Sequence, residues 1–443
     1  MEKMLETTPF NTLDSAFLNL DSKEEPLSVQ LEIRVDGSFD KIKLTESIRA
    51  AIQQHPMTRA YLKPVKGLDS SYTWRITDQS VDIPLEIVEA SSEQDILNFR
   101  SKLQSQQILL DSAPPLLLLL VRHSQGDYLM MNLSHVAGDG LSSFRIMTSI
   151  ARHYANQSDP VPTFNPLEKR DLKVLAGSQK LTERIVRSKL LVEHLRNSLS
   201  PPIRVKTKNV PTIEKKCLAG YGFININFST DETQRIKKRC KKPSTINDYL
   251  LASLILTIKK WNLQENGPSG RISIMMPVNL RPKDWWYEVV TNFSSYVPIS
   301  LMPSDQINLD TTLYAVTKLT MRLKEDGGAN ALIDFLEGLD NLMIPAAIRQ
   351  YLRTLTPLLE RTSIDTAVLS NLGQLNSELY FAEAGKVKEI WFSPPSLMPM
   401  GVTIGAASMN DQLFLTLRYR KAQFNDIAAL EFANIYKATI LNN

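Results

Sequence analysis

The fold is decided around one stretch, His135-Val136-Ala137-Gly138-Asp139-Gly140, which carries the pattern His-x-x-x-Asp-Gly. The apolar residues 128–133 before it are typical of a buried strand, and residues 141–147 after it have helical spacing. A strand that turns through two glycines into a helix presents the histidine at the rim of a sheet. Because glycine tolerates sharp turns, the loop can fold back and bring Asp139 near His135. We therefore expect His135 to accept a proton and Asp139 to shape the loop beneath it.

A structural interpretation of the same residues stays open. His135 can be a structural histidine at a strand end, with Asp139 as the N-cap of the following helix. The other histidines, His55, His123, His153 and His194, lie at helix ends, beside a turn or on amphipathic helices, and a structural role is expected for each. No pair of histidines has the spacing of metal ligands, so no metal site is predicted.

The composition indicates an ordinary globular protein. A chain of 443 residues with 43% apolar and 22% charged residues is expected to form two domains. No apolar segment has the length of a transmembrane helix, and residues 1–6 lack the pattern of a signal peptide. Cys217 and Cys240 are the only cysteines, which excludes a disulfide framework or a thiolate zinc site. These features favour a reducing, cytoplasmic setting.

The net charge of +4 is unevenly distributed, since residues 161–242 hold 19 Lys and Arg against seven Asp and Glu. Such a segment can attract a polyanion: a nucleotide diphosphate, an acidic carrier protein, an anionic membrane surface or nucleic acid. Nucleic acid is the weakest of these, because no aromatic residues alternate with the basic ones and no DNA-binding motif is present. A solvated helix face is the alternative interpretation. The densest basic block comprises Arg235, Lys237, Lys238, Arg239, Lys241 and Lys242.

The chain divides into three predicted parts: an N-terminal domain over 1–165, a basic linker with a helix over 166–205, and a C-terminal domain over 206–443. Both domains mix strands and helices, which predicts an α/β fold of two-layer sandwiches with a ligand cleft between them. Helices are expected near 40–55, 92–106, 141–154, 181–199, 231–240, 244–261, 311–324, 346–359 and 424–439. Strands are expected near 27–35, 72–76, 116–123, 128–134, 222–228, 271–280, 367–371, 388–392, 402–407 and 412–419.

Four segments together resemble one superfamily. The His135–Gly140 segment resembles the active-site motif of the chloramphenicol-acetyltransferase/condensation-like acyltransferases. Residues 245–248, Thr-Ile-Asn-Asp, resemble the Asn-Asp motif of the wax ester synthase/diacylglycerol acyltransferase branch. Residues 277–281, Pro-Val-Asn-Leu-Arg, followed by Asn292-Phe293, resemble a second-domain pattern of the same superfamily. Residues 369–373, Leu-Ser-Asn-Leu-Gly, resemble a segment of polyketide-associated acyltransferases and alcohol acetyltransferases. The motifs occur in the family's order, and the resemblance covers almost the whole chain.

This resemblance implies two chloramphenicol-acetyltransferase-like domains with an active-site tunnel between them. It implies acyl transfer from a CoA or carrier-protein thioester to an alcohol or amine, with His135 as general base. The thioester is the donor substrate, and no cofactor is expected. Asp139 is expected to face Arg281 across the domain interface, and Gly140 to allow close approach of the chain. Ser370 and Asn371 are expected either to bind the oxyanion near the tunnel or to form a strand-end turn.

The sequence departs from the family pattern at Ser134, where many members carry a first histidine. This change favours free-standing acyltransferases over peptide-forming condensation domains, and the absence of Asp-Phe-Gly-Trp-Gly excludes the plant branch. No Gly-x-Ser-x-Gly nucleophile elbow is present. The leading prediction is an ester-forming acyltransferase acting as a monomer. An amide-forming condensation enzyme and a non-catalytic relative that binds a carrier protein are the alternatives. For Asn247 and Asp248 we expect a helix-capping role.

Overall fold

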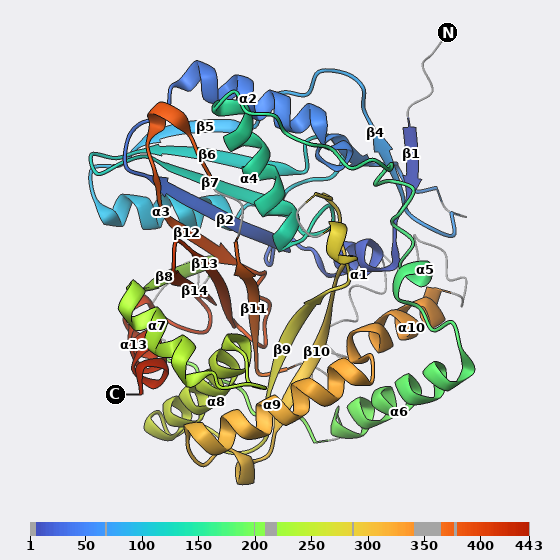
Figure 1. Ribbon diagram of the computed structural model, residues 1–443, viewed down its shortest axis with the longest axis vertical. Coiled ribbons are helices and arrows are strands. Elements are labelled where there is room, and N and C mark those ends of the chain that lie inside the picture. Colours follow the sequence, from blue (N-terminus) through green and yellow to red (C-terminus); the bar gives the residue numbers. More distant parts are fainter. Residues whose placement is uncertain are drawn as a thin grey trace.

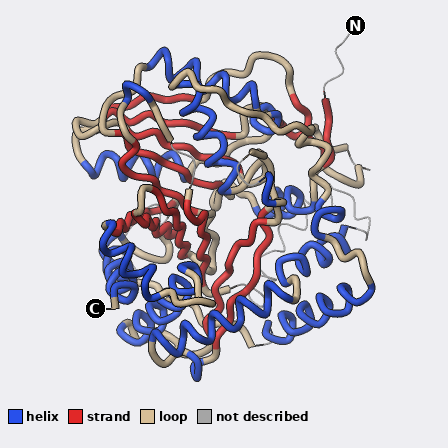
Figure 2. Tube along the Cα trace, viewed as in Figure 1, coloured by secondary structure: helices blue, strands red, loops and turns tan. Residues whose placement is uncertain are grey.

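The computed structural model describes residues 6–66, 69–198, 200–208, 219–285, 288–340, 365–375 and 379–442. The chain forms two lobes, each with a β-sheet and covering helices (Figure 1). Figure 2 shows the strands gathered inside the two lobes and most helices on the outside. The predicted α/β fold with two chloramphenicol-acetyltransferase-like lobes is confirmed.

The sheet of the first lobe is covered by helices on both faces. Alternate residues of its strands, such as Leu31 and Met131, pack with helices α2 (Lys41–Gln54) and α4 (Gly140–Tyr154). Met130 is the neighbour of Met131 on the same strand, so its side chain points to the opposite face of the sheet. There it packs with Ile96 of α3 (Glu93–Gln104). The strands, in spatial order, are β12 (Val387–Ser393), β2 (Ser28–Val35), β7 (Tyr128–Ser134), β6 (Leu116–Arg122) and β5 (Leu85–Glu89).

The sheet of the second lobe has its main helical layer on one face. Helices α8 (Ile246–Gln264), α9 (Leu309–Glu325) and α13 (Asp426–Leu441) share a core with its apolar residues. Helix α7 (Thr230–Arg239) contacts β14 and α13. The strands, in spatial order, are β10 (Ser294–Leu301), β9 (Ile272–Asn279), β11 (Ala367–Gln374), β13 (Val402–Met409), β14 (Gln412–Arg420) and β8 (Tyr221–Phe228).

One strand crosses between the lobes. β12 pairs antiparallel with β2, from Ser393 opposite Gln30 to Val387 opposite Val35, and so extends the sheet of the first lobe. It brings buried Trp391 and Phe392 with it. The boundaries 1–165, 166–205 and 206–443 stay predictions, but part of the last range lies in the first sheet. The crossing strand covers an edge of β2 that would otherwise expose unpaired backbone groups.

Most expected elements lie within a few residues of their predicted ranges, and the linker contains α5 (Leu172–Ala176) and α6 (Leu181–Ser198). The expected helix over 346–359 falls outside the described residues. Elements that the sequence patterns did not predict are α1 (Thr12–Leu20), α10 (Gly328–Asp340), β5, β10, β1 (Glu6–Pro9) and β3 (Ala60–Leu62). The last two form a small sheet with β4 (Thr73–Ile76), the strand expected near 72–76. Across the described ranges, no helix combines the length and apolar character needed to cross a bilayer.

Candidate active site

His135 follows the last residue of β7, and the turn after it leads into α4. Its backbone N–H donates to the Leu27 carbonyl at 2.9 Å, which ties the turn to the start of β2. Its ring Nδ1 lies 3.2 Å from the Gly138 carbonyl oxygen. Because a carbonyl oxygen only accepts hydrogen bonds, we assign the proton of the neutral ring to Nδ1. This tautomer leaves the Nε2 lone pair available to accept a proton.

The imidazole is partly exposed and has an apolar cover. Phe17 of α1 packs on the ring of His135, with ring centroids 4.2 Å apart and an interplanar angle of 31°. Burial of the ring lowers the pKa of His135, and the nearby Asp139 carboxylate, which acts in the opposite direction, only partly offsets this. The ring is therefore neutral at pH 7, the state that a general base requires.

Asp139 forms a buried, bidentate ion pair with Arg281, which follows β9 in the other lobe. The guanidinium nitrogens lie 2.6 Å and 2.9 Å from the two carboxylate oxygens, and the side chains are 4% and 1% exposed. Burial alone would raise the pKa of Asp139, but Arg281 and the backbone N–H groups of Phe293 and Ser142 together hold that pKa below its usual value. The structure thus brings together the two residues that the resemblance paired, and the carboxylate stays ionised.

Asp139 is also the N-cap of α4, the structural role that the sequence offered as an alternative. Its Oδ1 accepts from the backbone N–H of Ser142 at 3.0 Å and from the Ser142 hydroxyl at 3.0 Å. Its Oδ2 accepts from the Phe293 N–H of the other lobe at 3.0 Å. One carboxylate therefore fixes the helix that follows the histidine turn and joins that turn to the second lobe.

Asn292 holds the histidine turn from the second lobe, a role that the sequence did not assign. Its side-chain amide donates to the carbonyl oxygens of His135 at 2.7 Å and Val136 at 2.8 Å, and Asp14 Oδ1 of α1 lies 3.2 Å away. Asn292 was part of the quoted Pro-Val-Asn-Leu-Arg…Asn-Phe pattern. Its place in that pattern singles out the residue, but the pattern does not report its contacts.

Asp14 is a second residue that the sequence did not identify. It is fully buried, accepts from Trp74 Nε1 at 3.0 Å and is paired with Arg170. Asp14 also completes the capping box that starts α1 at Asn11, and α1 carries the Phe17 that covers the catalytic candidate. The capping pattern was the sequence signal for this helix.

The end of β11 reaches the start of α4. A Cβ atom added to Gly140 would lie 2.7 Å from Leu372 Cδ2 and 2.8 Å from Phe392 Cε2, so a larger residue here would have to displace these two side chains. The neighbouring Asn371 accepts from the Gly373 N–H at 2.8 Å, which forms the strand-end turn expected as one alternative. Ser370 is buried on the same strand. The oxyanion role of Ser370 and Asn371 stays a prediction.

This geometry agrees with comparisons with known proteins. The condensation-domain family model matches residues 16–170. An uncharacterized protein of Mycobacterium tuberculosis, Rv2305, is 32% identical over 444 residues, which cover 99% of this chain and 100% of the relative. The chain belongs to the same family as Rv2305, contains a condensation-domain match, and has the fold of chloramphenicol-acetyltransferase-like proteins. Gramicidin S synthase 1 of Brevibacillus brevis is 21% identical over a match that covers 91% of this chain and 37% of the synthase.

Solved structures share the fold. The trichothecene 15-O-acetyltransferase TRI3 of Fusarium sporotrichioides superposes with a TM-score of 0.72 at 11% identity, covering 98% of this chain and 94% of TRI3. The first condensation domain of the CDA synthetase gives a TM-score of 0.69 at 10% identity, with 98% and 95% covered. The epimerization domain of tyrocidine synthetase B gives 0.63 at 16% identity, with 100% and 98% covered. Since these proteins bear the names of different reactions, the superfamily fold does not specify the chemistry.

One further motif of the superfamily pattern, residues 245–248, starts helix α8. Thr245 and Asp248 form a capping box that starts α8, and Asp248 Oδ1 accepts from the Thr320 hydroxyl of α9 at 2.8 Å. Asn247 Nδ2 contacts the Met276 sulfur at 2.9 Å. Asp248 therefore makes the expected capping contact, whereas the Asn247 side chain contacts Met276 instead of the helix start.

The basic block lies on and just after α7, at the β8 edge of the second sheet (Figure 1). Most of its side chains are exposed, and Lys237 forms an ion pair with Asp411 at 3.3 Å. Arg235, Lys238 and Arg239 line a cavity of about 250 Å³ with Ile440 and Leu441 of α13. The contacts do not join this block to His135, so its role in donor or carrier binding stays a prediction.

Among the remaining histidines, His55 is buried against the Ser149 hydroxyl at 2.7 Å, and burial lowers its pKa to about 3. Cys217 lies outside the described residues. Within the described ranges, no group of three His, Cys, Asp or Glu side chains is placed to hold a metal ion.

Proposed function

We propose that this protein transfers an acyl group from a CoA or carrier-protein thioester to an alcohol and forms an ester, with His135 as general base. The supporting observation is the histidine turn itself. The contact with the Gly138 carbonyl assigns the ring proton to Nδ1. Partial burial lowers the pKa of the ring and so keeps it neutral, yet the residue is still partly accessible to solvent. A neutral imidazole with a free Nε2 suits removal of a proton from an incoming hydroxyl.

In the proposed reaction, Nε2 takes the proton of the acceptor hydroxyl as its oxygen attacks the thioester carbonyl. The C–S bond of the resulting tetrahedral intermediate breaks, and the imidazolium returns the proton to the departing thiolate. No protein nucleophile is needed because the thioester is already activated. A positioned base of this kind typically accelerates a reaction by about 10²–10⁴-fold.

Asp139, Gly140 and Arg281 support the site without chemistry of their own. The ion pair and the close contact at Gly140 hold the turn between two lobes. Such preorganisation matters because small displacements of a catalytic group reduce the rate strongly. Ser370 and Asn371 are our candidates for hydrogen bonding to the oxyanion.

For the donor, we propose an acyl-CoA or an acyl carrier protein, with no resident cofactor. The block of Arg235, Lys237, Lys238, Arg239, Lys241 and Lys242 is our candidate for binding the phosphates of CoA or an acidic carrier. A cytoplasmic monomer that does not bind nucleic acid remains our expectation from the sequence.

Amide formation with an amine acceptor is the second candidate, and the match to the condensation-domain model favours it. The same proton transfer at His135 serves an amine as well as a hydroxyl, so the acceptor alone separates the two reactions.

The experiment incubates the purified protein with acyl-CoA and acyl-carrier donors and a panel of alcohols and amines. Thiol release and product mass are measured. We expect an ester product and a loss of about 10²–10⁴-fold in His135→Ala. His123→Ala, which changes a histidine beside a turn, serves as the matched control and should keep wild-type activity. Equal activity of His135→Ala and wild type would contradict the proposal, and thioester binding without any turnover would leave only a carrier-binding role.

A further inference from the structure

Helix α6 presents a row of apolar side chains to solvent. Leu181, Ile185 and Val192 are 74%, 48% and 62% exposed, and their spacing of four and seven residues places them on one face of the helix. The opposite face is the packed one. There Leu190 packs against the core of the second lobe and Arg187 pairs with Asp334 of α10 at 3.2 Å. Figure 1 shows α6 at the rim of the molecule, outside α10.

Basic residues flank this row on both sides. Lys189 and Arg196 follow Ile185 and Val192 by four residues each, and Arg184 lies on the other flank. The two carboxylates of α6 are occupied: Glu183 accepts from the Gln179 backbone N–H at 3.0 Å, and Glu193 pairs with Arg322 at 2.9 Å. The exposed face of α6 therefore carries apolar residues along its middle, interrupted by Ser188, and positive charge along its edges.

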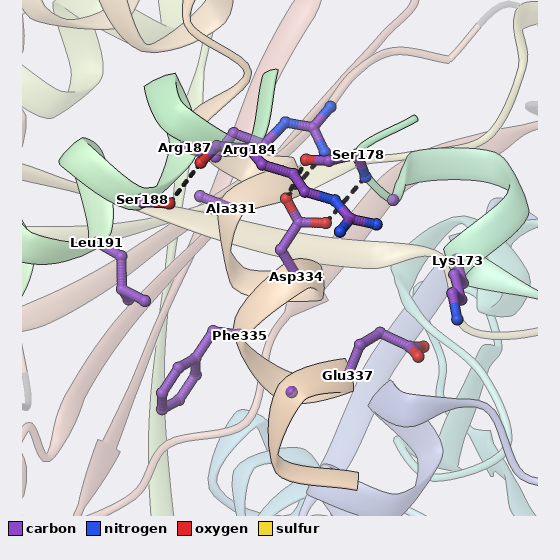
Figure 3. A pocket seen from close by; sticks show the side chains of 12 residues that line it. Lys173, Ser178, Arg184, Arg187, Ser188, Leu191, Ala331, Asp334, Phe335 and Glu337 are labelled. Atoms are coloured by element: carbon purple, nitrogen blue, oxygen red, sulfur yellow. Dashed lines mark hydrogen bonds and ion pairs between the residues drawn. The ribbon is translucent and has the colours of Figure 1, made fainter. Parts of the chain in front are cut away.

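A cavity of about 350 Å³ opens beside Arg184, between α6 and α10 (Figure 3). Its lining is divided. Leu191 and Phe335 form an apolar end, whereas Arg184 and Lys173 contribute positive charge at a distance from them. The Glu337 carboxylate also lines the cavity and accepts from the Thr12 hydroxyl at 2.7 Å. Among the described residues, neither Arg184 nor Lys173 has a carboxylate within ion-pair distance, while Asp334 is occupied by Ser178 and Arg187. An apolar tail beside an anionic headgroup matches this division.

We propose that the α6 face is a docking surface for an anionic lipid bilayer. The apolar row enters the boundary between headgroups and acyl chains, and the basic flanks contact the phosphates, with one headgroup entering the cavity at Arg184 and Lys173. Exposed apolar side chains of a helix, flanked by basic residues, can insert at a membrane surface without spanning it. The charges exclude a neutral surface as the preferred partner, because each basic residue near an anionic surface strengthens binding by about five-fold. This inference is independent of the proposed reaction.

The test is co-sedimentation of the full chain with vesicles of phosphatidylglycerol or of phosphatidylcholine alone. We expect binding to the first that weakens with salt, and at least ten-fold weaker binding to the second. Leu181→Ser combined with Ile185→Ser and Val192→Ser should abolish binding, and Lys189→Glu with Arg196→Glu should weaken it by more than about 25-fold. All these side chains are exposed, so circular dichroism and the melting temperature should match wild type.

Helix α7 supplies the matched control, because it is equally basic but its apolar Ile236 is buried. Arg235→Glu with Lys238→Glu should leave vesicle binding within about two-fold of wild type. Binding of wild type to neither vesicle, equal binding to both, or an equal loss in the α7 variant would each overturn the proposal. Capture of an acidic carrier protein by α6 in the absence of vesicle binding would also overturn it.

Discussion

Asp139 and Arg281 are 142 residues apart in the sequence and form a buried, two-point ion pair across the lobe interface. Arg281 also donates to the Thr291 carbonyl at 2.6 Å and lies over the Phe293 ring at 4.9 Å. The pair thus connects the turn that carries His135 to the loop that carries Asn292. Positioning of the imidazole depends on both lobes at once.

Breaking this pair should destabilise the protein strongly. Asp139→Asn leaves the Arg281 cation buried without its counter-ion, and we expect a loss of about 3–5 kcal/mol in the free energy of unfolding. The double variant with Arg281→Met should lose less than the sum of the single variants, because it leaves no unpaired charge. Denaturant titration gives both values. Glu46→Gln removes an exposed ion pair with Arg49 and serves as control, with an expected change below about 1 kcal/mol.

Activity should depend on pH through the lowered pKa of His135. Protonation removes the base, so kcat/KM should fall as pH decreases through a value below the ordinary 6.5. Phe17→Ala exposes the ring to water and should move this acid limb to higher pH, whereas Phe17→Leu keeps the apolar cover and should move it less. A wild-type acid limb at or above pH 6.5 would contradict this assignment.

Asn292→Ala should lower kcat more than it changes KM. The substitution leaves the His135 and Val136 carbonyls without their donor, which costs about 1–3 kcal/mol of stability and loosens the turn. We expect a decrease in kcat of about ten- to hundred-fold. Asn292→Asp should be worse, since a carboxylate would then face two carbonyls and Asp14. A change confined to KM would place Asn292 in substrate binding instead.

Gly140→Ala should impair both folding and activity. Its methyl group would press against Leu372 and Phe392, and overpacking of this kind typically costs about 1–3 kcal/mol. Gly338→Ala in α10 is the matched control, because an added Cβ there meets no atom within 4 Å. The control should be stabilised by up to about 1 kcal/mol, since alanine is the better helix former. Thermal unfolding of both variants measures the contrast, and similar melting temperatures would show that Gly140 tolerates a side chain.

Local patterns predicted much of the candidate site. The apolar run before His135 and the helical spacing after it placed the histidine at the end of β7, and the two glycines placed Asp139 at the start of α4. The helix expected from residue 244 likewise agrees with the observed start of α8 at the Thr245 capping box. Such features involve residues only a few positions apart, whose relation is set by the geometry of one helix or strand.

The contacts of Asn292 and Asp14 were beyond sequence reasoning. Asn292 reaches across 157 residues to the His135 carbonyl, and across 278 to Asp14. Whether a polar side chain caps its own loop or reaches another lobe depends on which surfaces pack together. The spacing of residues along the sequence does not reveal this. The paired roles of Asp139 and Arg281 came from family resemblance alone.

The sequence by itself determined the local elements, the histidine turn and the basic character of α6, because periodicity and capping act within one or two helical turns. Only the tertiary structure decided that β12 joins the first sheet, that Asn292 holds the histidine turn, and which face of α6 remains exposed. These outcomes depend on long-range packing, in which buried area and the pairing of buried polar groups select one arrangement among many that share the same local pattern.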